Sequence, residues 1–400
     1  TAIYEEYGTG IYLDSAQTKA MTTSSNAITK PSKAYKLTYN ANGGTCSTSS
    51  NTARYTFGGY YTSTGGSGTQ RITSSGYLAS GFTNTTYSAN TTLYAKWTSA
   101  SVTLPTPTRT GYTFNGWYTS SSGGTKVGNA GATYTPTSST TVYAQWTANT
   151  YTVQYNGNGA TGGSTASSRH TYNTSSALRA NGFTRAYTVT FNPNYTGSTN
   201  TTATATYSFK NWNTNASGTG TNYSNNASVS TLTSTQNGTV NLYAQWNSAS
   251  VTLPTPTRTG YTFNGWYTSS SGGTKVGNAG APYTPTSNTT IYAQWTANQY
   301  TVQYNGNGHT GGSTANSTHT YNVSSALRSN GFTRAYTVTY NTNGGTCSTS
   351  SNTATYSFKN WNTNASGTGT SYLNNASVST LTSTNNGTVN LYAQWNSASV

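Results

Sequence analysis

The sequence predicts an all-β, β-rich protein built from tandem modules, and three observations lead to this prediction. Aromatic residues make up 13% of the chain, including 35 Tyr, although only 32% of all residues are hydrophobic. Tyr, Trp, Thr and Val suit a pleated, half-buried surface. Short runs of these residues end at Gly- and Asn-rich turns and recur at fixed intervals. No amphipathic helix longer than about two turns is visible, and the best short candidate is 175–179.

An internal repeat with an offset of 149 residues organises the chain. Residues 101–149 and 250–298 differ at only three positions. Five segments close with Tyr-Ala-Lys/Gln-Trp, and they end at Trp97, Trp146, Trp246, Trp295 and Trp395. These closures predict a unique N-terminal segment, five repeat modules that are alternately long and short after the first, and the start of a further module. The corresponding boundaries are 1–34, 35–99, 100–149, 150–248, 249–298, 299–397 and 398–400.

Individual strands can be placed from the alternation of side chains. Tyr151, Val153 and Tyr155 alternate and are followed by the turn sequence Asn-Gly-Asn-Gly, so they are expected to share one face of a strand. Within 142–146, the alternation predicts that Val, Ala and Trp face inward in each closing strand. Gly116 interrupts a strand pattern and predicts a β-bulge.

The distribution of charge excludes several classes of function. Glu5, Glu6 and Asp14 are the only acidic residues. The repeats therefore lack the paired carboxylates of glycosidases, the Asp of a Ser-His-Asp triad and carboxylate ligands for calcium. The net charge of +15 comes from Lys and Arg that are spread almost singly. Since nucleic-acid binders gather such charge into a patch, no specific nucleic-acid partner is expected.

The cysteines and histidines are too isolated to predict a metal site or a cofactor. Cys46 and Cys347 occupy matching positions in two different repeats, so free thiols or an intermolecular disulfide remain. His170 and His319 are equivalent, His309 stands alone, and none has Cys or acidic residues at ligand spacing. The three histidines are expected to be surface turn residues.

Both ends of the sequence differ from the repeats. Residues 1–34 match no other part of the chain, whereas 396–400 repeats 247–251 and opens a module that is not finished. No run of 18 or more apolar residues is present, so no membrane span is expected in this segment. No signal peptide is visible at the N-terminus.

Several motifs resemble one known family. Residues 107–118 and 256–267 read Pro-Thr-Arg-Thr-Gly-Tyr-Thr-Phe-Asn-Gly-Trp-Tyr, and Gly-Gly-Thr-Lys follows each of them. Together with the Tyr-Ala-Gln-Trp closures and the turns at 39–44 and 340–345, they resemble the Listeria–Bacteroides repeat family, also called internalin B repeats. The resemblance implies small β-grasp-like modules on secreted or surface proteins of bacteria, which serve as stalks and adhesive spacers. It implies no catalytic residues.

The expected function is therefore structural or adhesive, at the bacterial cell surface or in secreted form, without enzymatic activity. The modules are expected to form an extended rod. Residues 1–34 of one subunit are predicted to complete the open C-terminal edge of the next by strand addition, which would build a head-to-tail filament. The residues expected to insert are Tyr4, Ile11, Tyr12 and Leu13. The alternative is a module that binds host or wall glycans, or wall polymers, through exposed Tyr and scattered Lys and Arg.

Overall fold

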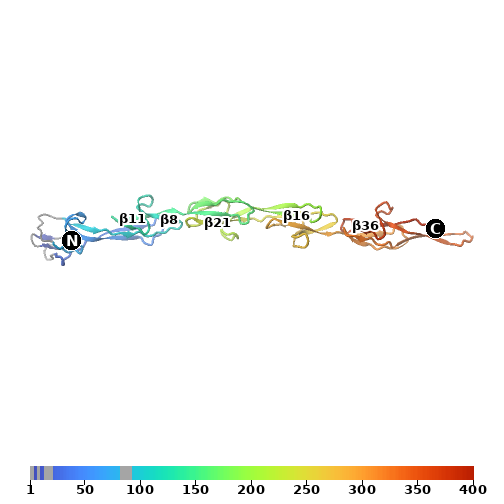
Figure 1. Cartoon of the computed structure of the whole chain (residues 1–400), viewed down its shortest axis with the longest axis horizontal. Helices are drawn as coiled ribbons and strands as arrows, with labels where there is room; N and C mark the ends of the chain where they lie inside the picture. The colour runs from blue at the N-terminus through green and yellow to red at the C-terminus, as the bar shows by residue number, and fades with distance from the viewer. Residues whose placement is uncertain (1–3, 7–9, 13–20, 82–91) are drawn as a thin grey trace. The chain divides into compact units, whose positions relative to one another are not determined.

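The computed structural model describes residues 4–6, 10–12, 21–81 and 92–400, with the backbone alone for the first two ranges. The described residues form 36 β-strands and the 3₁₀ helix η1 (Thr64–Gly66), and they contain no α-helix (Figure 1). The prediction of an all-β protein is confirmed. The helix predicted at 175–179 is wrong, because Ser176–Ala177 forms strand β15, which pairs with β20 (Ser228–Val229).

The chain divides into two compact units, and each is described by itself. Unit 1 comprises residues 1–156, 165–181 and 211–244, and unit 2 comprises 157–164, 182–210 and 245–400. The first sheet of unit 1 contains seven strands, β5 (Gln70–Ile72), β4 (Ser50–Tyr61), β3 (Lys33–Asn40), β11 (Thr140–Ala148), β8 (Tyr112–Tyr118), β9 (Lys126–Gly128) and β6 (Tyr94–Thr98). Two small ladders accompany it, β1 (Tyr4–Glu6) with β2 (Gly10–Tyr12) and β7 (Val102–Thr103) with β10 (Thr133–Tyr134).

The second sheet lies at residues 150–246 and has five strands. In spatial order they are β14 (Ser168–Thr171), β12 (Thr150–Asn156), β21 (Gly238–Trp246), β18 (Phe209–Asn213) and β19 (Asn222–Tyr223). The ladder of β15 with β20 accompanies this sheet.

Unit 2 repeats both arrangements. Its first sheet contains β13 (Gly162–Gly163), β16 (Phe183–Asn192), β26 (Thr289–Ala297), β23 (Tyr261–Tyr267), β24 (Lys275–Gly277) and β17 (Thr201–Tyr207). Its second contains β29 (Ser317–Thr320), β27 (Gln299–Asn305), β36 (Gly387–Trp395), β33 (Phe358–Asn362) and β34 (Ser371–Tyr372). The remaining ladders are β22 (Val251–Thr252) with β25 (Pro282–Tyr283), β30 (Ser325–Ala326) with β35 (Ser377–Val378), and β28 (Gly311–Gly312) with β31 (Phe332–Thr339) and β32 (Ser351–Tyr356).

Four of the five closing strands lie in the centre of a sheet. The strand β11 pairs with β3 in parallel on one side, where Val142 lies opposite Tyr39, and with β8 antiparallel on the other, where Ala144 lies opposite Trp117. The strands β21, β26 and β36 have the same two kinds of neighbour. Val142 and Ala144 are buried as their alternation predicts, whereas Trp146 is only partly buried.

The parallel neighbour of each central strand comes from a hairpin far earlier in the chain. The hairpin of β3 and β4 reaches β11, with Leu37 opposite Thr140, and the hairpin of β16 and β17 reaches β26, with Val189 opposite Thr289. About 100 residues lie between the partners, as a parallel pair needs a long connection. A hairpin within one long sequence segment therefore completes the sheet of the following short segment.

A bulge at a glycine changes the direction of β8, the antiparallel neighbour of the closing strand β11. The pairing of β11 with β8 shifts register between Gln145 and Trp146, opposite Gly116, whose φ is 137°. A side chain there would lie 3.1 Å from the backbone oxygen of Gly128, so only glycine fits without strain. The predicted bulge is confirmed, and it brings Trp117 into the core with no exposed surface.

Candidate functional site

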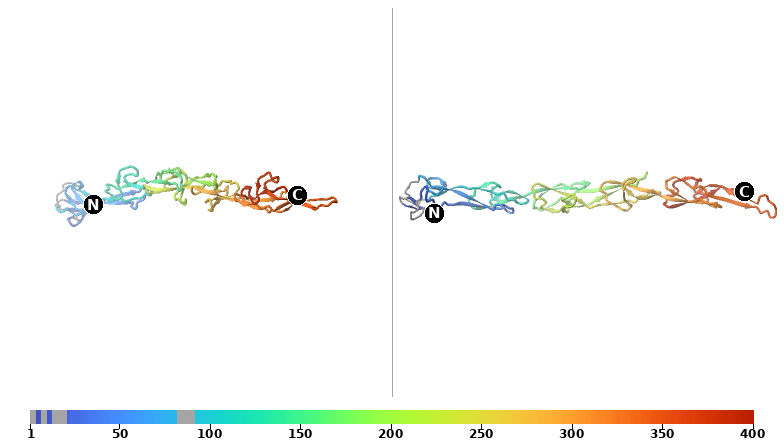
Figure 2. Two further views of the ribbon diagram at one scale, coloured as in Figure 1. Left: turned by 45° about the vertical axis from the view of Figure 1, so that its right-hand side comes forward. Right: turned by 90° about the horizontal axis from the view of Figure 1, so that it is seen from below.

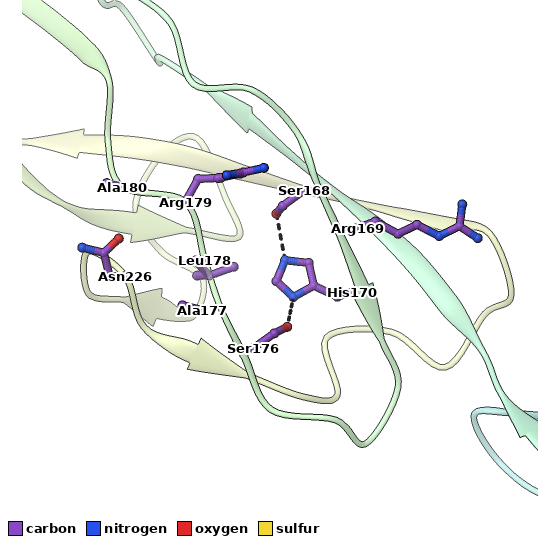
Figure 3. A pocket seen from close by; sticks show the side chains of 9 residues that line it. All are labelled: Ser168, Arg169, His170, Ser176, Ala177, Leu178, Arg179, Ala180 and Asn226. Atoms are coloured by element: carbon purple, nitrogen blue, oxygen red, sulfur yellow. Dashed lines mark hydrogen bonds between the residues drawn. The ribbon is translucent and has the colours of Figure 1, made fainter.

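A hollow beside β14 and β15 is the first place to look for a binding or catalytic site, because it contains His170 (Figure 3). Its lining residues are Ser168, Arg169, His170, Ser176, Ala177, Leu178, Arg179, Ala180 and Asn226. The His170 ring is 3% exposed and stacks on Tyr151, with ring centroids 5.6 Å apart. The prediction that His170 and His319 are surface turn residues is therefore wrong, whereas His309 is exposed.

Both nitrogens of His170 are held by serine hydroxyls. Nδ1 lies 2.6 Å from Ser176 Oγ and Nε2 lies 2.8 Å from Ser168 Oγ. The network continues to the hydroxyl of Tyr155, which lies 2.8 Å from Ser168 Oγ and accepts the backbone N–H of Arg179. Either neutral tautomer of the ring fits this network, because each serine hydroxyl can donate or accept.

This histidine lacks the partners that catalysis would require. Ser168 and Ser176 occupy the two ring nitrogens, and no carboxylate side chain exists beyond Asp14 to orient the ring or stabilise a charged form. Burial lowers the pKa of His170, and the nearby Arg179 lowers it further. The group is thus built to stay neutral, and the same network recurs around His319 with Ser317 and Ser325.

Acidification is expected to destabilise the sheets that contain His170 and His319. Their pKa values are lowered on folding, so the unfolded chain binds more protons below its own histidine pKa, about 6.5. Stability that is present above that pH is lost as the pH falls toward the folded-state value. Thermal unfolding monitored between pH 7.5 and 5 should show this loss. His170→Asn with His319→Asn should flatten the dependence, and His309→Asn should leave it unchanged; an equal dependence in all three chains would contradict the assignment.

Metal and thiol chemistry find little support in the described residues. No group of three or more His, Cys, Asp and Glu side chains gathers there. Cys46 packs against the core of the first sheet and is partly buried, whereas Cys347 lies in the loop between β31 and β32 and is exposed. Both are free thiols, and an intermolecular disulfide stays a prediction.

The predicted inserting strand at the N-terminus lies partly within the described backbone. Tyr4 pairs with Tyr12 and Glu5 with Ile11 in the ladder of β1 and β2. Leu13 lies outside the described residues. The insertion of these four residues into another subunit stays a prediction.

The most exposed tyrosines among the described side chains lie at two places. Among the residues whose side chains the structure describes, only Tyr94, Tyr336 and Tyr340 are exposed. Other tyrosines are partly buried and engaged within the chain, as where Arg109 lies 3.8 Å above the ring of Tyr112. Tyr94 belongs to β6, whereas Tyr336 and Tyr340 belong to β31 and the residue after it.

The first of these places is the closing strand β6, which we call the acceptor edge together with Ser32 and Lys33. In the described residues β6 pairs with β4 only, whereas the other closing strands have two neighbours. Leu93 and Ala95 are partly exposed, although the residues at their positions in the other four closing strands are at most 1% exposed. In the part of the chain that the structure describes, the acceptor edge therefore lacks the parallel strand that the other closing strands have.

The second place is the hairpin of β31 and β32, residues 332–356, which we call the donor hairpin. Its tip extends beyond the other strands of unit 2 in every view, where it is drawn in orange (Figure 2). Val338 is 43% exposed, while its equivalent Val189 in β16 is 0% exposed because β26 covers it. Among described residues, β31 pairs with β28 and β32 and with no closing strand.

Val189 and Val338 form a matched pair for testing this difference. Val189→Ala is expected to cost about 1–3 kcal/mol of unfolding free energy, because it leaves a cavity in a packed core. Val338→Ala should change the stability of the monomer by less than about 0.5 kcal/mol, because the side chain is already half in water. Denaturant unfolding at low protein concentration measures both. Equal costs would show that the donor hairpin is packed in solution.

Comparison with known protein families finds a match for two segments of this repeated β-sheet architecture. Residues 98–145 and 234–294 match the model of the Listeria-Bacteroides repeat domain, which confirms the resemblance for these two segments. Such repeats are typical of surface and extracellular proteins. No curated protein matches the chain, and no solved structure does. Within the described residues, no helix has the length and apolar character needed to cross a membrane.

Proposed function

We propose that this chain is a load-bearing structural repeat segment of a bacterial surface or secreted protein, without enzymatic activity. One observation carries the proposal: a hairpin from an earlier segment lies parallel to the closing strand of a later one, as β16 does to β26. Force applied to the N-terminal end of β16 and the C-terminal end of β26 shears this pair, so several cross-strand hydrogen bonds must break together. Such a connection suits a stalk, and the β-grasp-like modules are proposed to form an extended rod.

Single-molecule pulling of the 400-residue chain from its two ends tests this proposal. We expect a series of separate unfolding peaks, each releasing about 3.3–3.6 Å of extended chain per unfolded residue. Val189→Ala should lower the force of one peak, while Val323→Ala, at an exposed position, should leave all peaks unchanged. Smooth extension without peaks would contradict a load-bearing role.

We further propose that the chain associates with copies of itself, head to tail, by strand addition. Support comes from β6 and β31, which among the described residues lack the parallel neighbour that the equivalent strands have, since unpaired edges are templates for pairing with another chain. Electron microscopy of the purified chain across a concentration series tests this: filaments with a regular repeat support it, and isolated particles at all concentrations contradict it. Deleting residues 1–14 tests whether Tyr4, Ile11, Tyr12 and Leu13 are the inserting residues, because filaments that survive the deletion would exclude them.

Binding of glycans or wall polymers is the alternative function. It draws on the net charge of +15 and on partly exposed tyrosines, but the described surface offers few fully exposed rings on which a sugar could stack. A glycan and wall-polymer screen against residues 150–298 separates the two: saturable, ligand-specific binding favours the alternative, and its absence favours the structural role.

A further inference from the structure

We propose that the donor hairpin of one copy docks on the acceptor edge of a second copy, and that this contact links copies head to tail. The inference rests on the proposed self-association and names the two surfaces that carry it. It differs from insertion of residues 4–13, because here the inserting segment is 332–356 and the receiving strand is β6.

The chain contains its own template for this contact. Residues 39–55 and 340–356 differ at only two positions, Ala41/Thr342 and Arg54/Thr355. The first of these hairpins is docked on β11, where Leu37 and Tyr39 are 0% and 6% exposed. At the same positions in the second hairpin, Val338 and Tyr340 are 43% and 39% exposed. Nearly identical sequences thus present the same apolar face, covered in one place and open in the other.

Docked hairpins are held by a recurring pair of polar contacts. The indole N–H of the closing tryptophan donates to a backbone carbonyl in the hairpin turn, as from Trp146 to Ala41 at 3.0 Å. The asparagine one residue further donates its amide to the carbonyl of the closing alanine, as from Asn42 to Ala144 at 3.0 Å. The tryptophan contact recurs in three further modules, from Trp246 to Gly157, Trp295 to Pro193 and Trp395 to Gly306. The asparagine contact recurs from Asn194 to Ala293 and from Asn307 to Ala393.

These groups lack partners on both proposed surfaces. Among the described residues, the indole N–H of Trp97 has no hydrogen-bond acceptor, and the carbonyl of Ala95 receives no asparagine amide. On the donor hairpin, the side-chain amide of Asn343 has no acceptor in the described part of the chain; the side-chain oxygen of Asn341 instead accepts the backbone N–H of Asn343. The missing bonds are complementary: the acceptor edge offers the indole and the alanine carbonyl, and the donor hairpin offers the turn carbonyl and the asparagine.

Long and short modules receive their hairpins in the same way, so a donor hairpin fits the first module as well. In a short module, the backbone N–H of Thr45 donates to the carbonyl of Thr108 at 2.8 Å, and in a long module Thr161 donates to Thr184 at the same distance. The residue after each acceptor is Arg109 or Arg185, which faces a turn glycine. Hairpins that dock on short modules and hairpins that dock on long modules are therefore held by equivalent contacts.

The acceptor edge has a similar pair, a hydroxyl residue followed by a basic residue. Ser32 and Lys33 align with Thr184 and Arg185, which lie 152 residues later, when Tyr35 is aligned with Tyr187. Lys33 Nζ lies 4.9 Å from the ring of Tyr55, which matches the 5.0 Å between the Arg185 guanidinium and the ring of Tyr207. The ammonium group of Lys33 therefore lies beside the position that the turn of a docked hairpin would occupy.

The template also fixes the register of the contact. Val142 lies opposite Tyr39 and Tyr143 opposite Asn40, so Leu93 is placed opposite Tyr340 and Tyr94 opposite Asn341 in a parallel pair. Trp97 then donates to the carbonyl of Thr342, and Asn343 donates to that of Ala95. The contact joins two different surfaces, so a docked pair of copies retains one free donor hairpin and one free acceptor edge for further copies.

The contact depends on apolar burial and hydrogen bonds rather than on charge. The donor hairpin contains only Arg334 and the acceptor edge only Lys33 and Lys96, so no charges of opposite sign face each other. Salt should therefore weaken the association less than twofold between 50 and 500 mM, roughly, whereas a screened charge contact would be lost.

Three variants of the full chain, under reducing conditions that exclude disulfides, test the proposal. A donor-blocked chain carries Val338→Lys and Tyr340→Lys, at positions exposed in the monomer. An acceptor-blocked chain carries Ala95→Arg. A control carries Val323→Lys and Leu373→Lys, at two exposed apolar residues outside both surfaces. Sedimentation and light scattering should show concentration-dependent oligomers for the unmodified chain and the control, and monomers for each blocked chain.

Mixing the two blocked chains gives the sharpest result. Each retains one intact surface, so the mixture should form a 1:1 heterodimer and stop there. Nonspecific adhesion predicts larger species or none. Trp97→Phe removes the indole N–H and keeps an aromatic, though smaller, ring, so it should weaken association by at least about fivefold while the fold is retained. This variant covers the case in which Ala95→Arg disturbs folding.

Thiol labelling provides an independent readout. Cys347 is exposed in the free donor hairpin, whereas Cys46, at the same position of the docked hairpin, is partly buried. In a Cys46→Ser chain, labelling of Cys347 should slow at concentrations where oligomers form, and it should stay fast in the donor-blocked chain.

Three results with the variant chains would overturn the proposal. They are unchanged oligomers in the donor-blocked chain, no heterodimer in the mixture, and loss of oligomers when residues 1–14 are deleted. The last result would assign the contact to the N-terminal strand instead. An unmodified chain that is monomeric at every concentration would also overturn it, yet the load-bearing role would remain open to the pulling measurement.

Discussion

Replacing Trp266 by Ala is expected to destabilise its sheet by about 3–5 kcal/mol, the usual cost of removing a buried indole. Trp266 is 1% exposed and belongs to the core that the docked hairpin shares with β23 and β26. Its ring lies 5.3 Å from that of Phe191, and its N–H donates to the carbonyl of Pro254 at 2.9 Å. The substitution therefore removes apolar contacts and leaves a partly buried carbonyl without its donor.

Hydrogen exchange identifies the strands that lose stability in the Trp266→Ala chain. Protection should decrease in β23 and β26 and also in β16 and β17, because the hairpin depends on the same core. The sheet around β36 should keep its protection. Trp361→Ala is the matched control, since Trp361 is buried in that other sheet and should reverse the pattern. Retained protection of β16 and β17 in the Trp266 variant would show that the hairpin is stable without its partner.

Replacing Asn213 by Ala is expected to cost about 2–4 kcal/mol, because one buried amide organises a whole loop. Asn213 is 0% exposed. Its Nδ2 donates to the carbonyls of Gly218 and Gly220 and to the side chain of Asn222, at 2.7–3.2 Å. Its Oδ1 accepts the backbone N–H groups of Asn215 and Gly220. Alanine would leave these backbone groups unsatisfied inside the fold.

Two further substitutions make that measurement specific. Asn213→Asp keeps the acceptor oxygen but loses the Nδ2 donor and buries a charge, so it should be at least as costly as alanine. Asn115→Ala removes an exposed pair with Thr147 and should cost less than about 0.5 kcal/mol. Thermal unfolding of the three variant chains shows the order of their losses in stability. A cost for Asn213→Ala no greater than that for Asn115→Ala would mean that the loop is held by other contacts.

Local features of the fold could be predicted from the sequence because they depend on neighbouring residues. Tyr151, Val153 and Tyr155 are at most 9% exposed, as their alternation requires. Gly116 forms a bulge because its backbone takes a positive φ beside Gly128. The family resemblance came from short motifs of the same kind.

Features that depend on distant residues could not be predicted. The alternation in 183–192 indicates a strand but gives no sign that its partner is 289–297, since both hairpin classes and all closing strands look alike in sequence. His170 was assigned to the surface because the serines that bury its nitrogens are recognisable only once β14 and β15 are placed. One signal for Asn213 was present: Trp-Asn at 212–213 and 361–362 replaces the Trp-Tyr of the short modules.

The long connection between each hairpin and its parallel partner also has a kinetic consequence. Val189 emerges during synthesis before Ile291, and at about 5–20 residues per second the delay over roughly 100 residues is about 5–20 s. A hairpin forms in microseconds. Its apolar face is therefore exposed to water for the seconds that pass before the partner strand is synthesised. The exposed face of 332–356 resembles that waiting intermediate. Thr, Ser and Asn are abundant around this face. These polar residues keep the incomplete sheet soluble during synthesis until its partner strand is available.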